Sequence, residues 1–322
     1  MPESTIHHRT LEIPDWASGM RVDKYLAQRF PDRSRSWIAR GIRDGQVHDS
    51  SGQVLRAGSR IKGSQTLFLF LPGISATEPP PPLPTILHCD ERVIVLDKPA
   101  GLLAHPAGTD FSWAVIGLAK AHWPDDRVDL VHRLDRDTSG VIVLTRDIEA
   151  NRLLKAAIKA GDCDKEYQAF CRGVIPWESR TLRGPIGPDD GLIRIKMRVT
   201  EGGLSARTDV SVLRTQGAMT HVHCRIHTGR THQIRVHLAN EGHSLIGDRM
   251  YGLPPEVFLH TLDHGADSWV REQAGAPRQA LHAARIRVPH PDGGTLDVSA
   301  PLPDDMCRWW NNPAVLPQDG IP

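Results

Sequence analysis

The sequence predicts an α+β protein, in which a small α/β unit precedes a larger body with a mixed, largely antiparallel sheet flanked by helices. Three observations support this fold class. Apolar residues recur at helical spacing near the N-terminus, and strand-like runs alternate with helical segments after residue 85. Between these parts, residues 75–84 have the sequence SATEPPPPLP, in which four consecutive prolines favour an extended, semi-rigid linker.

Two helices are expected in the N-terminal unit. The first covers residues 22–30, because apolar side chains recur there every three or four positions and Pro31 ends the pattern. The second covers residues 34–45, with Ser34 as the N-terminal cap and Gly45 at the end.

A short sheet is expected to complete this unit. A turn at residues 49–52 and the alternating run TLFLFL at 66–71 indicate strands. Residues 1–17 show no clear period, so we expect an extension there. The folded unit is therefore expected over residues 18–74.

The first strands of the body are expected to be buried. Residues 93–96 form a short apolar strand before a turn at 98–101, and residues 141–144 form a continuous apolar run typical of a strand with both faces buried. A helix is expected at 148–160, where Gly161 follows the last periodic residue.

The second half of the body has two alternating segments. Residues 165–172 and 220–226 alternate in the manner of half-buried strands. A helix is expected at about 231–241, after the loop 227–230, and Thr231 could cap it.

Composition and length exclude several classes of protein. The chain has 322 residues, a formal net charge of +1 and 39% hydrophobic residues, as is ordinary for a soluble globular protein. No apolar run approaches the ~18–20 residues that span a bilayer. The N-terminus lacks the apolar segment of a signal peptide, so we expect a cytoplasmic protein. We expect the body over residues 85–310 and a tail over 311–322.

The cysteines give no sign of a disulfide framework or of a cysteine zinc site. There are five, an odd number, they are widely scattered, and no CxxC pair occurs. Buried free thiols are the expected state.

The small net charge conceals an asymmetry along the chain. From residue 19 to residue 73, ten Lys and Arg oppose four acids, which gives +6, whereas residues 240–322 have six bases and eleven acids, which gives −5. A basic N-terminal unit on a near-neutral body suits a partner with a phosphate backbone. The basic residues that we expect to contact it are Arg35, Arg40, Arg43 and Lys62.

The motif VHRLDRDTSG at residues 131–140 carries the first candidate for catalysis. Asp135 lies between Arg133 and Arg136, and neighbouring cations keep a carboxylate ionised by lowering its pKa. An ionised Asp in a loop before a buried strand could act as a nucleophile or a base. The alternative is a turn whose polar side chains only satisfy the backbone.

Two further motifs offer polar groups. Tyr167, at the start of an expected strand, could stack on a base or relay a proton, or it could be a packing aromatic. In the segment 227–237, Arg230 and Arg235 could reach a phosphate or a carboxylate. Its three histidines are five residues apart and diverge by ~140° on a helix, so we expect no metal site.

Nucleotide-binding and hydrolase motifs are absent from the sequence. There is no GxGxxG and no Walker lysine motif, so a nucleotide cofactor is not expected. The absence of a G-x-S-x-G elbow disfavours an α/β-hydrolase.

Taken together, these segments resemble the RluA/RluC/RluD family of RNA pseudouridine synthases. The resemblance covers about residues 86–302, with HRLDRDTSGVIVLTR as its most specific block and KEYQAF, ARTDV and HTGRTHQIRVHLANEGHSLIGDRMYG in the family's order. Residues 19–73 resemble the S4-like RNA-binding domain that often precedes this catalytic domain. The usual Val-Asn-Gly turn is replaced here by His48-Asp49-Ser50-Ser51-Gly52.

The resemblance implies roles for four residues. Asp135 matches the family's catalytic aspartate, and Tyr167 matches its active-site tyrosine. Arg235 matches the arginine that pairs with the aspartate. Arg133 matches the arginine that enters the RNA helix where the target base leaves it, and Arg230 is expected to contact RNA as well.

The resemblance also implies the reaction and its partners. Uridine becomes pseudouridine by exchange of the N1–C1′ bond for a C5–C1′ bond, without redox change or hydrolysis, so no metal or cofactor is expected. Large-subunit (23S) ribosomal RNA is the expected substrate, and transfer RNA is the alternative; a monomer is expected. A non-catalytic RNA-binding protein and a histidine-based metal hydrolase are the competing interpretations.

Overall fold

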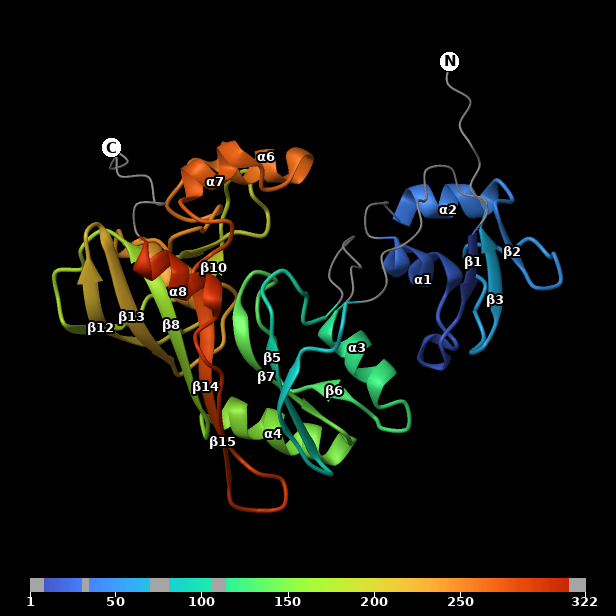
Figure 1. The fold of residues 1–322 in the computed structure, drawn as a ribbon, viewed down its shortest axis with the longest axis horizontal. Coiled ribbons are helices and arrows are strands. Elements are labelled where there is room, and N and C mark those ends of the chain that lie inside the picture. Colours follow the sequence, from blue (N-terminus) through green and yellow to red (C-terminus); the bar gives the residue numbers. More distant parts are fainter. Residues whose placement is uncertain (1–8, 31–34, 70–80, 106–113, 313–322) are drawn as a thin grey trace.

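The computed structural model describes residues 9–30, 35–69, 81–105 and 114–312 of the chain. Figure 1 shows a small N-terminal unit beside a larger body. Most of the predicted linker 75–84 and nearly all of the predicted tail 311–322 lie outside the described residues.

The N-terminal unit packs its helices against a three-stranded antiparallel sheet with the order β1-β3-β2. Apolar side chains from all of its elements form one core. The elements are β1 (Arg9–Glu12), the 3-10 helix η1 (Asp15–Ala17), α1 (Val22–Arg29), α2 (Arg35–Arg43), β2 (Val47–Asp49) and β3 (Thr66–Leu69).

Both predicted helices of this unit are confirmed. Helix α1 ends at Arg29, ahead of Pro31, and α2 ends at Arg43. Gly45 follows with a φ of 74°, a left-handed conformation that glycine adopts without strain. The predicted cap Ser34 lies outside the described residues.

The structure corrects the expectation that residues 1–17 are an extension. The segment Arg9–Glu12 pairs with Thr66–Leu69, and both Leu11 and Ile13 are buried in the core of the unit. A four-residue strand with few apolar positions has too short a pattern to be recognised alone. At least residues 9–17 therefore belong to the folded unit.

The body is built on a ten-stranded sheet. Its main path runs β4-β5-β7-β14-β8-β13-β12-β9, with β6 beside β7 and β15 beside β14. Every neighbouring pair is antiparallel except β7 and β14, which are parallel. A separate two-stranded sheet joins β10 to β11.

The strands of the body are β4 (Thr85–Cys89), β5 (Val93–Lys98), β6 (Asp129–Leu130), β7 (Ser139–Thr145), β8 (Asp164–Arg172), β9 (Ser179–Leu182), β10 (Ile186–Pro188), β11 (Met197–Val199), β12 (Thr208–Gln216), β13 (Met219–Ile226), β14 (Leu281–Pro289) and β15 (Thr295–Ser299). The helices are α3 (Val115–His122), α4 (Ile148–Ala160), α5 (Gln233–Asn240), α6 (Pro255–His264), α7 (Ser268–Ala274) and α8 (Asp304–Asn311).

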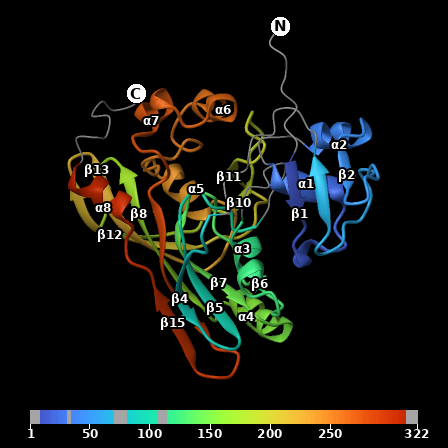
Figure 2. The ribbon, with the colours of Figure 1, turned by 45° about the vertical axis from the view of Figure 1, so that its right-hand side comes forward.

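Helices cover both faces of the sheet. Apolar side chains of α3 and α5 pack on one face, against β5, β7 and β8. On the opposite face α4 packs on β5 and β7, and α8 packs on β8 and β13. In both views α6 and α7 lie together at the end of the body away from α4 (Figures 1 and 2).

The predicted elements of the body are confirmed. All residues of β7 are buried, because the strand lies between the two helical layers. The predicted helix 148–160 has the observed bounds of α4, and Gly161 ends it with a φ of 87°. The predicted strands 165–172 and 220–226 pair with one another as β8 and β13.

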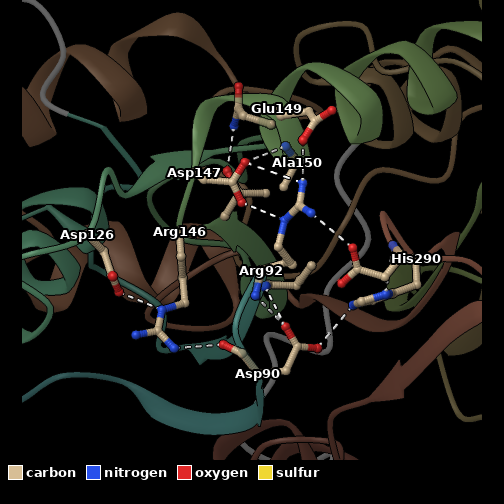
Figure 3. Close-up of polar contacts among 12 residues, drawn as sticks. Asp90, Arg92, Asp126, Arg146, Asp147, Glu149, Ala150 and His290 are labelled. Carbon is tan, nitrogen blue, oxygen red and sulfur yellow. Dashed lines mark hydrogen bonds and ion pairs between the residues drawn. The ribbon is translucent and has the colours of Figure 1, made fainter.

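A polar network fixes the start of α4 to the start of β5 (Figure 3). Arg92 Nε donates to Asp147 Oδ2 at 2.7 Å, and Asp147 Oδ1 accepts from the backbone N–H of Ala150 at 2.9 Å. Asp90 accepts from the N–H of Arg92 at 2.8 Å and lies 3.1 Å from His290 Nε2. These residues do not line the cavity described below, so their role is to hold the fold.

Within the described residues, none of the helices combines the length and the apolar character that crossing a membrane would require.

Candidate active site

The motif 131–140 forms the loop between β6 and β7 and enters β7. The N–H of Thr138 donates to the carbonyl of Asp135 at 3.2 Å, so the backbone turns directly after this carboxylate. Gly140 has a φ of 110°, and a Cβ there would lie 2.2 Å from the carbonyl oxygen of Ala283 on β14. Glycine thus allows β7 and β14 to pair closely, which fixes the end of the loop.

Basic side chains from outside the loop hold it in place. The buried Lys98 donates from Nζ to the carbonyl of Arg136 at 2.9 Å. Burial lowers the pKa of Lys98 to about 7, although the loop carboxylates favour its charged form. Arg249 forms an ion pair with Asp137, and Arg278 Nη1 donates to the carbonyl of Asp137 at 3.3 Å. The loop is therefore a rigid support for its side chains.

Arg235, in the first turn of α5, joins two carboxylates. Its Nε and Nη2 donate to the two oxygens of Asp248 at 2.7 and 3.0 Å, and its Nη1 donates to Asp135 Oδ2 at 3.1 Å. Asp248 also accepts from the backbone N–H groups of Met250 and Tyr251. The buried Asp248 thus orients the guanidinium, and the remaining nitrogen is directed at Asp135.

The surroundings of Asp135 keep it ionised. Burial alone would raise the pKa of Asp135, but the charge and the hydrogen bond of Arg235, together with the other basic neighbours, bring the net pKa below the ordinary value. Arg133 contributes in the same direction, but less than Arg235 does. The stabilising cation therefore comes mainly from a segment 100 residues away, and not from the arginines that flank Asp135 in the sequence.

Tyr167 lies on β8, on the face of the sheet that α3 and α5 cover. Its side chain is 7% exposed, and burial together with the charge of Asp135 raises its pKa. Its hydroxyl therefore remains protonated at neutral pH. It lies close enough to Asp135 for the charge of that carboxylate to affect its pKa. The structure thus joins Asp135 and Arg235 by a hydrogen-bonded ion pair and places Tyr167 near Asp135, but Tyr167 is not among the residues that line the cavity described next.

A cavity of about 1200 Å³ is lined by Asp135 and Arg235. It is larger than the roughly 300–1000 Å³ of most small-molecule pockets, so it could admit a nucleotide that remains part of a chain. One wall is formed by the loop after β6, and another by α6. The lining includes Arg133, Asp135, Arg136, Lys155, Ile195, His232, Arg235, Arg249, Phe258, Thr261 and Leu262.

Two other arginines of the body, Arg133 and Arg230, were predicted to contact RNA, and the structure gives them different positions. Arg133 lines the cavity and is exposed to solvent. Arg230 is half-buried, and its Nε donates to the carbonyl of Ser205 at 3.0 Å. Arg230 therefore fastens the loop before α5 to a neighbouring segment and is not among the residues that line the cavity.

The predicted RNA-binding residues of the N-terminal unit lie apart from this cavity. Arg40, Arg43 and Lys62 are exposed. Arg35 is also exposed but pairs with the buried Asp23 at 2.8 Å, so part of its role is structural. None of these four basic residues lines the cavity.

The three histidines of the segment 227–237 each have a separate set of contacts. His227 lies 2.6 Å from Asp209, His232 lies 2.8 Å from the hydroxyl of Tyr251, and His237 Nδ1 lies 2.9 Å from Thr208. In the part of the chain that the structure describes, no three His, Cys, Asp or Glu side chains are grouped as metal ligands would be.

The structure corrects one detail of α5 and adds one residue to the site. His232, not Thr231, is the N-cap, and no side chain caps the helix there; instead Gln233 Oε1 accepts from the N–H of Arg230 at 3.1 Å. Asp248, which orients Arg235, was not predicted. A single acid within the apolar segment SLIGD was the available signal, because a buried carboxylate needs a partner.

Comparison with known proteins agrees with this geometry. A family model described as RNA pseudouridylate synthase matches residues 92–240. Ribosomal large subunit pseudouridine synthase D of Pseudomonas aeruginosa is 36% identical, over 94% of this chain and 95% of that protein. The protein of the same name from Neisseria meningitidis serogroup A is 35% identical, over 92% of this chain and 79% of its own length.

Two solved structures share the fold of the body. Human RNA Pseudouridylate Synthase Domain Containing 4 is 26% identical with a TM-score of 0.54, covering 70% of this chain and 91% of that chain. Human RNA Pseudouridylate Synthase Domain Containing 1 is 23% identical with a TM-score of 0.55, covering 70% and 86%. These structures confirm the predicted α+β fold class. Together with the sequence identities over almost the whole chain, they show that this protein belongs to the RluA family of RNA pseudouridine synthases.

Proposed function

We propose that this isomerase converts uridines of large-subunit ribosomal RNA to pseudouridine, with Asp135 as the catalytic carboxylate. The main support is the ion pair between Asp135 and Arg235 at 3.1 Å, which keeps a charged carboxylate at the wall of a nucleotide-sized cavity. The choice of RNA rests on relatives named ribosomal large subunit pseudouridine synthase D, with identities of 34–36%.

The residues of the site divide the work of the isomerisation. Asp135 attacks C1′ of the target nucleotide, or removes its 2′ proton to give a glycal, and both routes need the ionised carboxylate that Arg235 maintains. Tyr167 offers a flat ring against the detached uracil and a protonated hydroxyl. The N1–C1′ bond is exchanged for a C5–C1′ bond, C5 loses its proton and N1 gains one, so atoms and electrons balance without a redox partner or hydrolysis.

The target uridine must leave its stack before it can reach Asp135. This costs a few kcal/mol, which contacts elsewhere on the RNA have to offset. The exposed Arg133 at the cavity wall is suited to occupy the position that the base vacates. Arg40, Arg43 and Lys62 of the N-terminal unit are suited to contact phosphates, and binding would then weaken steeply with salt.

Pseudouridine mapping tests the substrate. Total RNA from cells with and without the gene is compared at every uridine, and then RNA from deletion cells that carry the Asp135→Asn variant. The proposal expects one or more sites in large-subunit RNA to disappear with the gene and to stay absent with the variant. Sites lost only from transfer RNA would overturn the substrate, and sites restored by Asp135→Asn would overturn the catalytic role.

A further inference from the structure

His232 has an unusual backbone conformation beside the catalytic carboxylate. Its φ is 58°, and Ser64 is the only other non-glycine residue with a positive φ among the described residues. Residues in such conformations persist when their surroundings hold them, and they cluster at functional sites. The side chain of His232 lines the cavity, with Nε2 3.9 Å from Asp135 Oδ2.

The hydrogen bonds around Tyr251 assign the tautomer of His232. The N–H of Met197 donates to the hydroxyl oxygen of Tyr251 at 2.9 Å, and the same hydroxyl lies 2.8 Å from His232 Nδ1. Tyr251 is buried, so its single hydrogen would lack a partner unless it points at Nδ1. With Nδ1 as the acceptor, the hydrogen of the neutral imidazole resides on Nε2.

Burial keeps the ring of His232 neutral. Burial lowers its pKa to about 4, and the nearby Arg235 adds to this effect. Asp135 and Asp248 oppose the shift, and Arg133 supports it. At neutral pH the ring therefore presents an uncharged N–H donor to the cavity, on the same side as the catalytic carboxylate.

The donor and the carboxylate lie side by side at the cavity wall. At 3.9 Å, His232 Nε2 and Asp135 Oδ2 are too far apart for a direct hydrogen bond, so both can face a bound nucleotide. With C1′ or the 2′ hydrogen placed at the carboxylate, the atoms bonded to C1′ come within reach of Nε2. On the uracil, O2 is the oxygen nearest to the bond that breaks, because C2 is attached directly to N1.

We propose that His232 donates its Nε2 hydrogen to O2 of the target uracil and stabilises the base as it leaves C1′. This inference rests on the proposed function. When the N1–C1′ bond breaks, its electron pair remains on uracil and the charge is shared by N1, O2, C5 and O4, with O2 the oxygen nearest to the broken bond. Asp135 either bonds to C1′ or accepts the 2′ proton. His232 keeps its proton throughout, so it acts as a fixed donor toward developing charge.

A neutral donor suits this position better than a cation would. A protonated His232 would form an ion pair with Asp135 and compete with Arg235 for the carboxylate that has to react. A donor whose hydrogen is fixed by Tyr251 needs no reorganisation when charge develops on the base, which is the condition under which such donors contribute most.

Two substitutions at position 232 distinguish the effect of losing the side-chain donor from the effect of disturbing the backbone conformation. Asparagine tolerates a positive φ, but its short amide does not reach the place of Nε2. Glutamine places an amide N–H close to that place. We expect His232→Asn to slow single-turnover conversion roughly 10²–10³-fold, as loss of an oxyanion-type donor does, with RNA affinity and melting temperature near those of the wild type. We expect His232→Gln to recover part of the rate.

The decisive experiment combines these variants with a change in the substrate. The RNA is a fragment that contains a mapped target uridine, made once with uridine and once with 2-thiouridine at that position. If His232 donates to O2, replacing this oxygen by sulfur, a poorer acceptor, weakens a hydrogen bond that only the wild type forms. The ratio of wild-type to His232→Asn rates should therefore change by at least tenfold.

The outcomes distinguish the inference from the proposed function. Conversion of unmodified RNA by the wild type, and its loss in Asp135→Asn, report on the function alone. Equal effects of the thio substitution on wild type and His232→Asn would overturn the role of His232 while leaving the function intact. A rate of His232→Asn within threefold of wild type, with the fold retained, would overturn it as well.

Discussion

Replacing Arg235 by methionine should make the reaction dependent on pH in a range where the wild type is not. Arg235 Nη1 lies 3.1 Å from Asp135 Oδ2. At an effective dielectric constant of about 20, an ion pair at that separation is worth about 5 kcal/mol, an upper bound for a site open to a cavity. A carboxylate beside an arginine has its pKa lowered by roughly 1–3, which is the change that the variant should reverse.

The sign of the pH effect follows from the ionised form being active. In the wild type the pKa of Asp135 lies below its ordinary value, so the single-turnover rate should be flat at neutral pH. Without Arg235, burial raises this pKa, and the rate should fall as the pH drops through it. Tritium release from 5-³H-uridine RNA between pH 4.5 and 9 measures the profile, whose acidic limb should move upward by roughly one to three pH units.

A second substitution keeps this test free of misfolding. Asp248 is 1% exposed and pairs with the same guanidinium, so Arg235→Met alone would leave a buried carboxylate without its partner, at a cost of roughly 3–5 kcal/mol. The double variant Arg235→Met/Asp248→Asn removes both charges and leaves no buried carboxylate without a partner. If its rate is reduced by the same factor at every pH, Arg235 does not act through the ionisation of Asp135.

Three further predictions follow from the site and the charges. Tyr167→Phe keeps the ring and loses only the hydroxyl, so its tritium-release rate should fall less than that of Asp135→Asn, and an equal fall would assign the hydroxyl an essential role. Replacing Arg40 and Arg43 by glutamine should lower the slope of log affinity against log salt by about 0.7–0.9 for each phosphate that is no longer neutralised, with an unchanged rate at saturating RNA; an unchanged slope would exclude a role of these arginines in phosphate binding. Urea unfolding should show stability falling as the pH drops from about 6.5 to about 4, because four histidines have a folded pKa of about 4 and the unfolded chain binds protons that the folded chain does not. A flat pH dependence over that range would contradict the burial of these rings, which are His132, His221, His232 and His282.

The regular elements of the body could be predicted because local signals agree with the tertiary structure. Helix α4 has an N-terminal capping Asp147, an apolar face and a terminal Gly161, and its predicted bounds are those observed. Strand β7 is apolar along its length because it lies between two helical layers. In contrast, β1 depends on pairing with β3, which is far away in the sequence, and its own pattern is too short to reveal it.

The residues of the site also differ in whether local sequence could reveal them. Asp135 is recognisable because its charged neighbours and its position before a buried strand are local properties. The cation that chiefly stabilises it comes from α5, and the carboxylate that orients this cation comes from the segment after α5, so the clamp exists only in the folded chain. The tautomer of His232 depends in the same way on Tyr251, whose hydroxyl is positioned by a backbone group of β11.

The catalytic role of Asp135 is tested most directly by single-turnover tritium release by the Asp135→Asn variant from 5-³H-uridine RNA that carries a mapped target site. The substitution preserves size and most hydrogen bonding but removes the charge on which both chemical routes depend. We expect release at background level with RNA affinity near that of the wild type. Release at the wild-type rate would contradict the catalytic assignment of Asp135 and the interpretation of the loop that carries it.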